Sequence, residues 1–403
     1  MKARCKEAPG ARDDCRREMH CECECPRRRY RMIPIVVAGA ILALMSVKPR
    51  PVRAPCRIGD YPDSDAFDDM THRPHRPRRA TSASPPALSR DACRIAWTEA
   101  GNPLGQPVVV LHGGPGSGSR PAGMLHLFDL RRTRVVLVDQ RGAGASTPRG
   151  GLRHNNTMRL IGDLDALRAQ LGIARWGVVG GSWGAALALA YAGRYPSRVT
   201  GVVLRGLFLT STREVRGLFI GARARAPRAW QRLTAAAGTT RADRLIGCCA
   251  RRLRPGAGAA RQRAVALAWS AYEDAILTGR PARGARPTQR TVDRLIDKYR
   301  IQAHYLQRAC WLGERRLLAL AREAAQAGVP LHAVHGTRDR VCPVDNVDRL
   351  ARAVPAAIVE RVRAGHLASD AALAYGVARA VREMLTAVAD AAPHAESRAQ
   401  SHA

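Results

Sequence analysis

The sequence predicts an α/β protein with a mostly parallel sheet, helices on both faces and an inserted helical cap. Three observations support this fold class. Apolar runs of strand length alternate with helix-forming segments between residues 108 and 191, as they do when parallel strands are joined by helices. The strand pattern disappears from about 211 to 318 and returns at 330–336 and 357–362. Glycine-rich or polar motifs follow the predicted strands, at the sheet edge where sites form.

The first half of the predicted core contains two buried strands and a capped helix. The strands are 108–111 and 134–138, which are continuous apolar runs. The helix can be capped by Asn156 or Thr157, and Gly172 ends it.

The segment 180–184 (GGSWG) places a serine between a strand and a helix. The apolar run 175–179 precedes it, and the strong helix formers of 185–191 follow it. This order is that of a nucleophile elbow, where glycines avoid collisions around a strained turn. Ser182 is therefore the predicted nucleophile. An ordinary glycine-rich turn is the alternative, so the prediction depends on finding the other catalytic groups.

A nucleophilic serine also needs N–H donors for the oxyanion. The loop 112–116 (HGGPG) follows a predicted strand and can turn a backbone N–H toward the serine, because glycine tolerates the required torsions. The predicted donors are the backbone N–H groups of Trp183 and Gly114, with Gly113 as the alternative to Gly114. His112 precedes the nucleophile along the chain and is predicted to be structural.

The acid and the base are expected after the serine, in the order Ser, Asp, His. Asp339 and His366 each follow one of the last two predicted strands. An imidazole can take the serine proton and return it to the leaving group, because its pKa lies near neutrality. Asp339 could instead cap the next helix, and His366 could be an ordinary loop residue. Asp345 and Asp370 are rival acids, but neither directly ends a strand.

Several motifs together resemble one known family. They are HGGPG at 112–116, DQRGAGAS at 139–146, NNT at 155–157, GGSWGAALALAY at 180–191, VLRGLFL at 203–209, HGTRDRVCP at 335–343 and AGH at 364–366. From about Arg94 to about Met384 the chain resembles the prolyl aminopeptidases (proline iminopeptidases), α/β-hydrolase-fold serine peptidases that release an N-terminal proline. The resemblance implies the α/β-hydrolase fold, Ser182, Asp339 and His366 as a catalytic triad, and short peptides with a free N-terminus as substrates. It implies no metal and no organic cofactor.

Two positions in the predicted cap bear on the substrate. Members of the resembled family hold the substrate amine with two carboxylates, one in a W-x-x-[WY]-E segment and one just before an H-Y pair. The segment 269–273 (WSAYE) matches the first, so the resemblance implies Glu273 as the amine anchor, with a solvated helix charge as the alternative. In 301–305 (IQAHY) the second position is Gln302, an uncharged acceptor. Loss of a charged partner for an ammonium costs about 1.5–3 kcal/mol.

The predicted function is that of a serine aminopeptidase that releases an N-terminal residue, preferentially proline, through an acyl-enzyme. Proline itself is favoured by the resemblance alone. The first alternative is an esterase or amidase that acts on substrates without a free imino group. Gln302 favours it, because this residue stands where the resembled family has a carboxylate. The second alternative is a non-catalytic basic binding protein.

The net charge of +33 does not by itself predict a nucleic-acid partner. Of the 66 basic residues, 62 are arginine, and they are scattered along the chain instead of forming one block. Solvated helix faces tolerate such a composition, so no nucleic-acid partner is expected. The eleven cysteines lack the spacing of a disulfide framework, which favours free thiols in a reducing, cytoplasmic compartment.

The predicted organisation has five segments. They are a disordered or over-extended leader (1–90), the first part of the core (91–210), a helical cap (211–318), the second part of the core (319–390) and a disordered tail (391–403). Met70 is an alternative start. The apolar run 33–47 behind Arg27 to Arg29 resembles a signal region, but it is short for a bilayer span, which needs about 20 residues. Export or anchoring through 27–47 is the alternative to a cytoplasmic location, and no oligomeric state is predicted.

Overall fold

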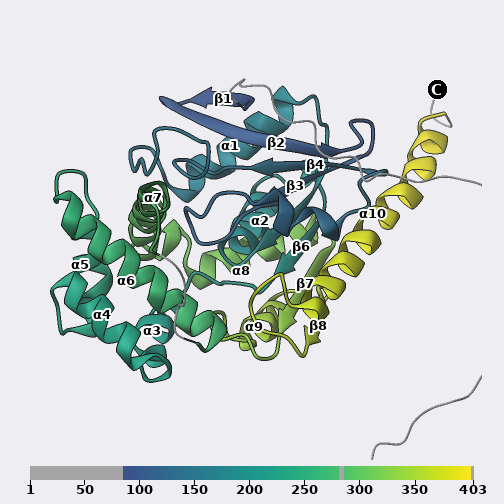
Figure 1. Cartoon of the computed structure of the whole chain (residues 1–403). Helices are drawn as coiled ribbons and strands as arrows, with labels where there is room; N and C mark the ends of the chain where they lie inside the picture. The colour runs from purple at the N-terminus through teal and green to yellow at the C-terminus, as the bar shows by residue number, and fades with distance from the viewer. Residues whose placement is uncertain (1–84, 281–285, 401–403) are drawn as a thin grey trace, which may run out of the picture. The chain divides into compact units, whose positions relative to one another are not determined.

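The computed structural model describes residues 85–280 and 286–400, with side chains described as far as residue 387. Its strands are β1 (Ala87–Arg90), β2 (Cys93–Gly101), β3 (Gln106–Leu111), β4 (Thr133–Val138), β5 (Trp176–Gly181), β6 (Val199–Arg205), β7 (Leu331–Gly336) and β8 (Ile358–Val362). Within the described residues they form one sheet in the order β1-β2-β4-β3-β5-β6-β7-β8 (Figure 1). β2 runs antiparallel to β1 and β4, and all neighbours from β4 to β8 run parallel. The mostly parallel sheet that the sequence predicts is confirmed.

Helices cover both faces of this sheet. They are α1 (Thr157–Gln170), α2 (Trp183–Arg194), α8 (Gly313–Gln326), α9 (Asp345–Ala353) and α10 (Ala371–Gln400). The first four pack on one face, and α10 packs on the other (Figure 1). Alanines and glycines make up much of α2, and it is buried from Trp183 to Gly193. Such small side chains let the helix lie close to both the sheet and α8. At the start of α1 the Asn156 side chain accepts a hydrogen bond from the Arg159 backbone N–H at 3.1 Å, as expected of a helix cap.

In the described part of the chain, five further α-helices lie between β6 and α8. They are α3 (Thr212–Phe219), α4 (Pro227–Ala237), α5 (Leu245–Arg252), α6 (Ala259–Thr278) and α7 (Gln289–Leu306). Together they bury an apolar cluster of their own that includes Phe219, Trp269, Tyr272 and Tyr299. In Figure 1 these helices lie together to the left of the sheet. We call α3 to α7 the helical insertion.

The end of the helical insertion differs from the sequence expectation. The helical cap is predicted to extend to 318, whereas α7 ends at Leu306 and α8 begins at Gly313. Ala309, Cys310 and Trp311 between them have φ angles of 44°, 53° and 53°, which a right-handed helix does not accommodate. The predicted cap boundary at 318 lies inside α8, a helix that packs against α2.

Both ends of the described chain extend further than the sequence predicts. The core is expected from about Asp91, but β1 already pairs with β2 from Ala87. At the other end α10 continues to Gln400, where a disordered tail is expected from 391. That segment is rich in alanine, which has the highest helix propensity. The apolar run 33–47 and Met70 lie outside the described residues.

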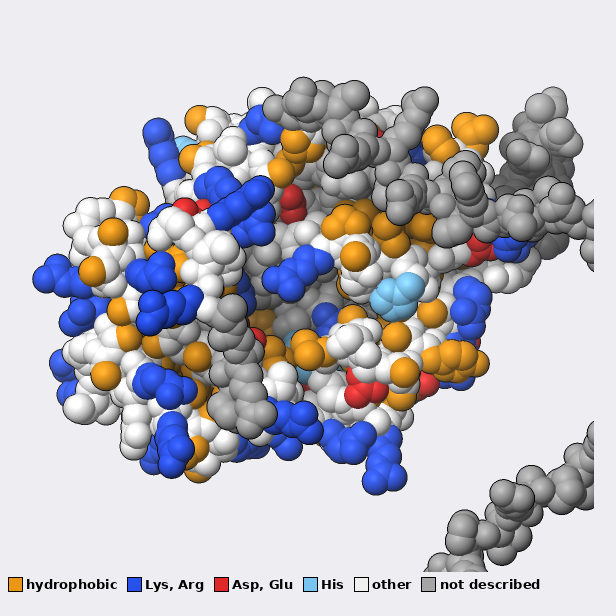
Figure 2. Space-filling view, viewed as in Figure 1, with side chains coloured by type: hydrophobic (Ala, Val, Ile, Leu, Met, Phe, Trp, Pro, Cys, Tyr) orange, Lys and Arg blue, Asp and Glu red, His pale blue; other side chains and the backbone are white. Residues whose placement is uncertain are grey.

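Basic side chains are spread over the face shown in Figure 2 and do not form a single patch there. Of the helices in the described ranges, none combines the length and the apolar character that a membrane span requires.

Candidate active site

Ser182 lies at the carboxyl end of β5, directly before α2. Its φ and ψ are 57° and −119°, a conformation that is costly for a residue with a side chain. The backbone N–H of Ser182 holds this turn by donating to the Arg205 carbonyl at 2.8 Å. A Cβ atom on Gly180 would lie 2.2 Å from the Gly184 carbonyl oxygen, and one on Gly184 would lie 2.1 Å from that of Leu111. The elbow therefore requires both glycines.

His366 and Asp339 are joined directly. Nδ1 of His366 lies 2.6 Å from Oδ2 of Asp339, and Oδ1 of Asp339 accepts the backbone N–H groups of Val341 and Cys342 at 2.8 and 2.9 Å. Burial raises the pKa of the Asp339 carboxyl, but the hydrogen bond from His366 and the nearby His335 outweigh burial and hold that pKa below its usual value. The carboxylate is therefore ionised at neutral pH and can orient the imidazole.

Ser182 and His366 line the same pocket, which has a volume of about 240 Å³. Among the described residues, no hydrogen bond joins the Ser182 hydroxyl to the His366 ring in this structure. Catalytic hydrogen bonds are often long before substrate binds and tighten in the complex. A Cβ atom on Gly206 would lie 3.2 Å from His366 Nδ1 and 3.4 Å from Asp339 Oδ2, so a glycine at this position leaves room for the pair.

The two rival acids are engaged elsewhere. Asp345 forms an ion pair with Arg213 at 2.9 Å and is 43% exposed. Asp370 accepts the backbone N–H of Gly365 at 3.1 Å. It is Asp339 whose carboxylate contacts the His366 ring.

The predicted oxyanion donors Trp183 and Gly114, and the alternative donor Gly113, line the same pocket as Ser182. A Cβ atom on Gly113 would lie 3.3 Å from the Ser182 Cβ and 3.9 Å from its Oγ. Gly114 has a φ of 98°, and a Cβ there would lie 2.1 Å from Ser117 Oγ. The backbone N–H groups of Gly113, Gly114 and Trp183 donate to no other group in the described part of the chain. All three are thus free to donate to an oxyanion, and their role stays a prediction.

His112 fastens the loop that carries these glycines. Its Nδ1 donates to the Gly113 carbonyl at 3.0 Å, and its Nε2 accepts the Gln140 backbone N–H at 3.1 Å. The Gln140 side chain donates to the His112 carbonyl at 2.9 Å and accepts the Trp183 indole N–H at 2.8 Å. Gln140 therefore ties the loop to the helix that follows Ser182, and His112 has the structural contacts that the sequence predicts.

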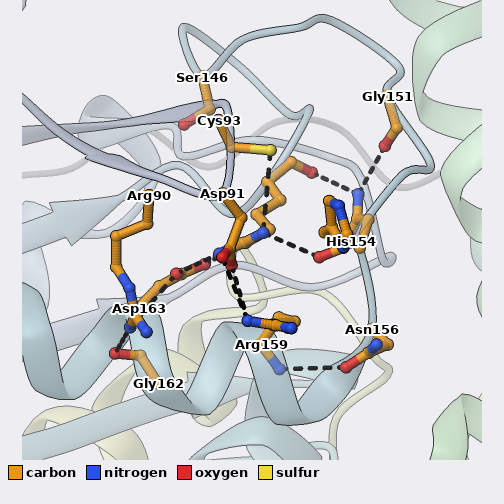
Figure 3. Close-up of polar contacts among 12 residues, drawn as sticks. Arg90, Asp91, Cys93, Ser146, Gly151, His154, Asn156, Arg159, Gly162 and Asp163 are labelled. Atoms are coloured by element: carbon orange, nitrogen blue, oxygen red, sulfur yellow. Dashed lines mark hydrogen bonds and ion pairs between the residues drawn. The ribbon is translucent and has the colours of Figure 1, made fainter.

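Arg141 stabilises the neighbouring loop through a buried ion pair with Asp163. Figure 3 labels Asp163 and two further partners of the Arg141 guanidinium, Asp91 and His154. This guanidinium, 1% exposed, donates to both carboxylate oxygens of Asp163 at 2.5 and 2.6 Å. It also donates to Asp91 at 2.8 Å and to the His154 carbonyl at 2.9 Å. These charged hydrogen bonds connect the loop after β4 with α1 and with the turn between β1 and β2.

Arg205 is a residue of the site for which the sequence predicts no role. Its guanidinium donates to the His366 carbonyl, and its own carbonyl accepts the Ser182 N–H. Arg205 therefore links the turn that carries Ser182 to the turn that carries His366. Burial lowers its pKa. The signal in the sequence is a charged residue directly after the apolar run 202–204, within VLRG.

The helical insertion contributes a polar cluster to the same pocket, around Glu273. One carboxylate oxygen of Glu273 accepts from Lys298 Nζ at 2.7 Å and from the Tyr299 hydroxyl at 3.0 Å. The other accepts from Gln302 Nε2 at 2.5 Å and from the Trp269 indole at 3.2 Å. The structure thus brings Glu273 and Gln302 together and adds Lys298, to which the sequence analysis assigns no role.

Comparison with known proteins gives one consistent family. A model of the alpha/beta hydrolase fold matches residues 106–371. The chain is 39% identical over 283 residues to the proline iminopeptidase of Xylella fastidiosa (strain Temecula1 / ATCC 700964). The aligned region covers 70% of this chain and 89% of that protein. It is 36% identical over 299 residues to the proline iminopeptidase of Neisseria gonorrhoeae, covering 72% and 93%. For the proline iminopeptidase of Arabidopsis thaliana the identity is 36% over 289 residues, covering 70% and 74%.

A solved structure supports the fold independently. The haloalkane dehalogenase DbeA-M1 loop variant from Bradyrhizobium elkanii matches with a TM-score of 0.50 at 18% identity, covering 77% of this chain and 97% of that one. Identity at this level bears on the fold alone. The family follows from the sequence relatives: the chain belongs to the proline iminopeptidases, within the α/β-hydrolase fold.

Proposed function

We propose that the protein is a serine aminopeptidase that releases an N-terminal proline from peptides with a free N-terminus. One observation carries the proposal: Ser182 and His366, whose ring contacts the buried Asp339, line the same pocket as Glu273. A substrate carbonyl at Ser182 and a substrate amine at Glu273 can therefore belong to the same terminal residue. The pocket volume of about 240 Å³ suits one small residue.

The wall of the pocket is suited to a compact apolar ring. Its apolar lining side chains include Phe208, Leu218, Phe219, Ile276, Leu306 and Val341. Burying an apolar ring against them gains about 25 cal/mol per Å² of surface. Glu273 lies in the same pocket and would hold the charged end of the residue.

The reaction follows from the positions of these groups. His366 takes the proton of the Ser182 hydroxyl as its oxygen attacks the substrate carbonyl, and Asp339 stabilises the imidazolium. Backbone N–H groups of Trp183 and of Gly114 or Gly113 donate to the oxyanion. His366 then protonates the leaving amine as the peptide bond breaks. Water attacks the prolyl ester on Ser182, and His366 takes a proton from that water. His366 returns the proton to Ser182 Oγ as the ester bond breaks, and proline leaves.

The direct test is release of proline from proline 4-nitroanilide by the wild-type protein and by Ser182→Ala. The wild type should release proline and 4-nitroaniline in equal amounts, and the variant should lose at least about 10³-fold in kcat. A fluorophosphonate should label the wild type at Ser182 and block turnover. Turnover that survives in a folded Ser182→Ala protein would exclude this mechanism.

Two features favour a second candidate, a hydrolase for esters or amides without a free amine. Gln302 replaces a carboxylate, and Lys298 already pairs with Glu273. This candidate predicts that acetylation of the substrate nitrogen leaves kcat/KM unchanged.

A further inference from the structure

We propose that Lys298 determines the amine specificity of this pocket: its ammonium occupies Glu273 in the free enzyme and is displaced when the ammonium of a substrate binds. The proposal rests on the proposed function, because it takes Glu273 as the carboxylate that holds the substrate amine.

The carboxylate of Glu273 has no acceptor site left for a substrate. A carboxylate offers about four lone-pair positions. Lys298 and Tyr299 occupy those of Oε2 at 2.7 and 3.0 Å, and Gln302 and Trp269 occupy those of Oε1 at 2.5 and 3.2 Å. An incoming ammonium can therefore bind Glu273 only by replacing one of these four donors.

Lys298 is the donor whose replacement conserves charge. Its side chain is 23% exposed and that of Glu273 is 15% exposed, so water screens the pair only in part. While Lys298 and Glu273 are paired, their charges cancel, so the pair does not attract an approaching substrate ammonium. The positive charge of Lys298 also repels it. Exchange of Lys298 for the substrate ammonium restores the same ion pair, whereas displacement of Tyr299, Gln302 or Trp269 would crowd two cations around one carboxylate.

A second pocket can accept the Lys298 ammonium when it leaves Glu273. Lys298 lines this second pocket of about 550 Å³, which shares Ser117 with the first and contains Arg120 and Arg294. The flexible four-carbon stem of a lysine allows its ammonium to move between neighbouring positions. Asp297, the residue before Lys298, also lines this second pocket. Its carboxylate already forms an ion pair with Arg149 at 3.2 Å. The displaced Lys298 ammonium would thus be hydrated or held weakly. Replacement of Lys298 by the substrate ammonium at Glu273 therefore costs free energy.

Gln302 supplies a second acceptor for the incoming amine. Its side chain is 5% exposed, and its Oε1 has no hydrogen-bond partner among the described residues. An unpaired buried acceptor is unfavourable until a donor arrives. With Lys298 displaced, Glu273 Oε2 and Gln302 Oε1 offer two acceptors, which equals the number of N–H donors on the secondary ammonium of proline. A primary ammonium would keep one N–H unpaired.

The test compares Lys298→Met with the wild type on proline 4-nitroanilide. Removal of the competing ammonium should lower KM about tenfold and leave kcat within about twofold. The matched control is Arg294→Met, which removes a positive charge from the same helix and the second pocket and should leave KM within about twofold of the wild type. An unchanged or raised KM in Lys298→Met would overturn the proposal, as would an equal fall of KM in the control.

A second variant guards against misfolding of Lys298→Met, which leaves Glu273 without its cation. Lys298→Gln keeps a donor for Glu273 without the charge, and it should lower KM by roughly threefold, between the wild type and Lys298→Met. The thermal midpoint and the rate of fluorophosphonate labelling at Ser182 show which variants are folded. A wild type that releases no proline would refute the proposed function. A wild type that releases proline, with KM unaffected in both Lys298 variants, would refute this inference alone.

Discussion

Nδ1 of His366 lies 2.6 Å from Oδ2 of Asp339, a carboxylate that is fully buried. This contact places the ring proton on Nδ1 and leaves Nε2 free to accept a proton from Ser182. Catalysis by the proposed mechanism therefore depends on Asp339 as much as on Ser182.

Asp339→Asn should lower kcat by about 10³-fold or more, because the amide favours the wrong imidazole tautomer. The fold should be retained, since the Asn side-chain oxygen can still accept the Val341 and Cys342 N–H groups. Steady-state kinetics on proline 4-nitroanilide measure the effect. The control is Asp345→Asn at the rival acid, and an equal loss in that variant would contradict the assignment of Asp339.

Arg205→Met should lower kcat by about 10-fold to 100-fold with little change in KM, because a small displacement of the base is costly. The variant removes the donor to the His366 carbonyl and keeps the Arg205 backbone carbonyl that holds the Ser182 turn. Kinetics together with the rate of fluorophosphonate labelling check this. A loss confined to KM would show that Arg205 acts on substrate binding instead.

Gln302→Glu should raise kcat/KM for proline 4-nitroanilide by roughly tenfold, because a second carboxylate adds a charged partner for the ammonium. Lys298 lies on the neighbouring Glu273 and can offset the new charge. The same substitution should not improve turnover of N-acetylproline 4-nitroanilide, and an equal gain on both substrates would contradict the role of Gln302 in amine binding.

Arg141→Met should lower the free energy of unfolding by about 3–5 kcal/mol, because it leaves the Asp163 carboxylate buried without its partner. Asp163 is 3% exposed, and burial already raises its pKa. Urea denaturation followed by circular dichroism measures the change. Arg131→Met provides the control, because the Arg131 side chain is 91% exposed in its pair with Asp129 and its removal should cost at most about 1 kcal/mol.

Stability should fall as the pH drops below about 6.5, and His332 should account for part of the fall. Burial lowers the pKa of His332 below the ordinary histidine value of 6.5. As the pH falls below 6.5, His332 therefore becomes protonated in the unfolded chain while it is still neutral in the folded chain. The associated slope is at most about 1.4 kcal/mol per pH unit for one proton. Urea denaturation from pH 8 to pH 5 should show a shallower slope for His332→Leu than for the wild type. Parallel slopes would show that His332 does not contribute.

The sequence predicted β3, β4, β5, β7 and β8 but not β6, and it placed three distant residues after three of the predicted strands. It could do so because β5 and β7, which precede Ser182 and Asp339, are fully buried and mostly apolar. His366 follows β8, which has apolar residues but no buried position. The pair β1 and β2 was missed because these strands mix polar with apolar residues, as in the segment 93–101 (CRIAWTEAG).

The roles of Lys298 and Arg205 could not be predicted from the sequence. Lys298 contacts Glu273 only because α6 and α7 pack side by side, and the two residues are 25 positions apart. Arg205 and His366 are 161 positions apart. Contacts between side chains so far apart leave no periodic signal in one sequence.

The most direct test of the whole account is the ratio of kcat/KM for proline 4-nitroanilide to that for N-acetylproline 4-nitroanilide, measured with the wild-type protein. The account predicts a ratio of at least about 100, because acetylation removes the ammonium that Glu273 binds and adds bulk in a pocket sized for one residue. A ratio near one would contradict it, since the pocket would then hydrolyse prolyl amides without recognising a free N-terminus.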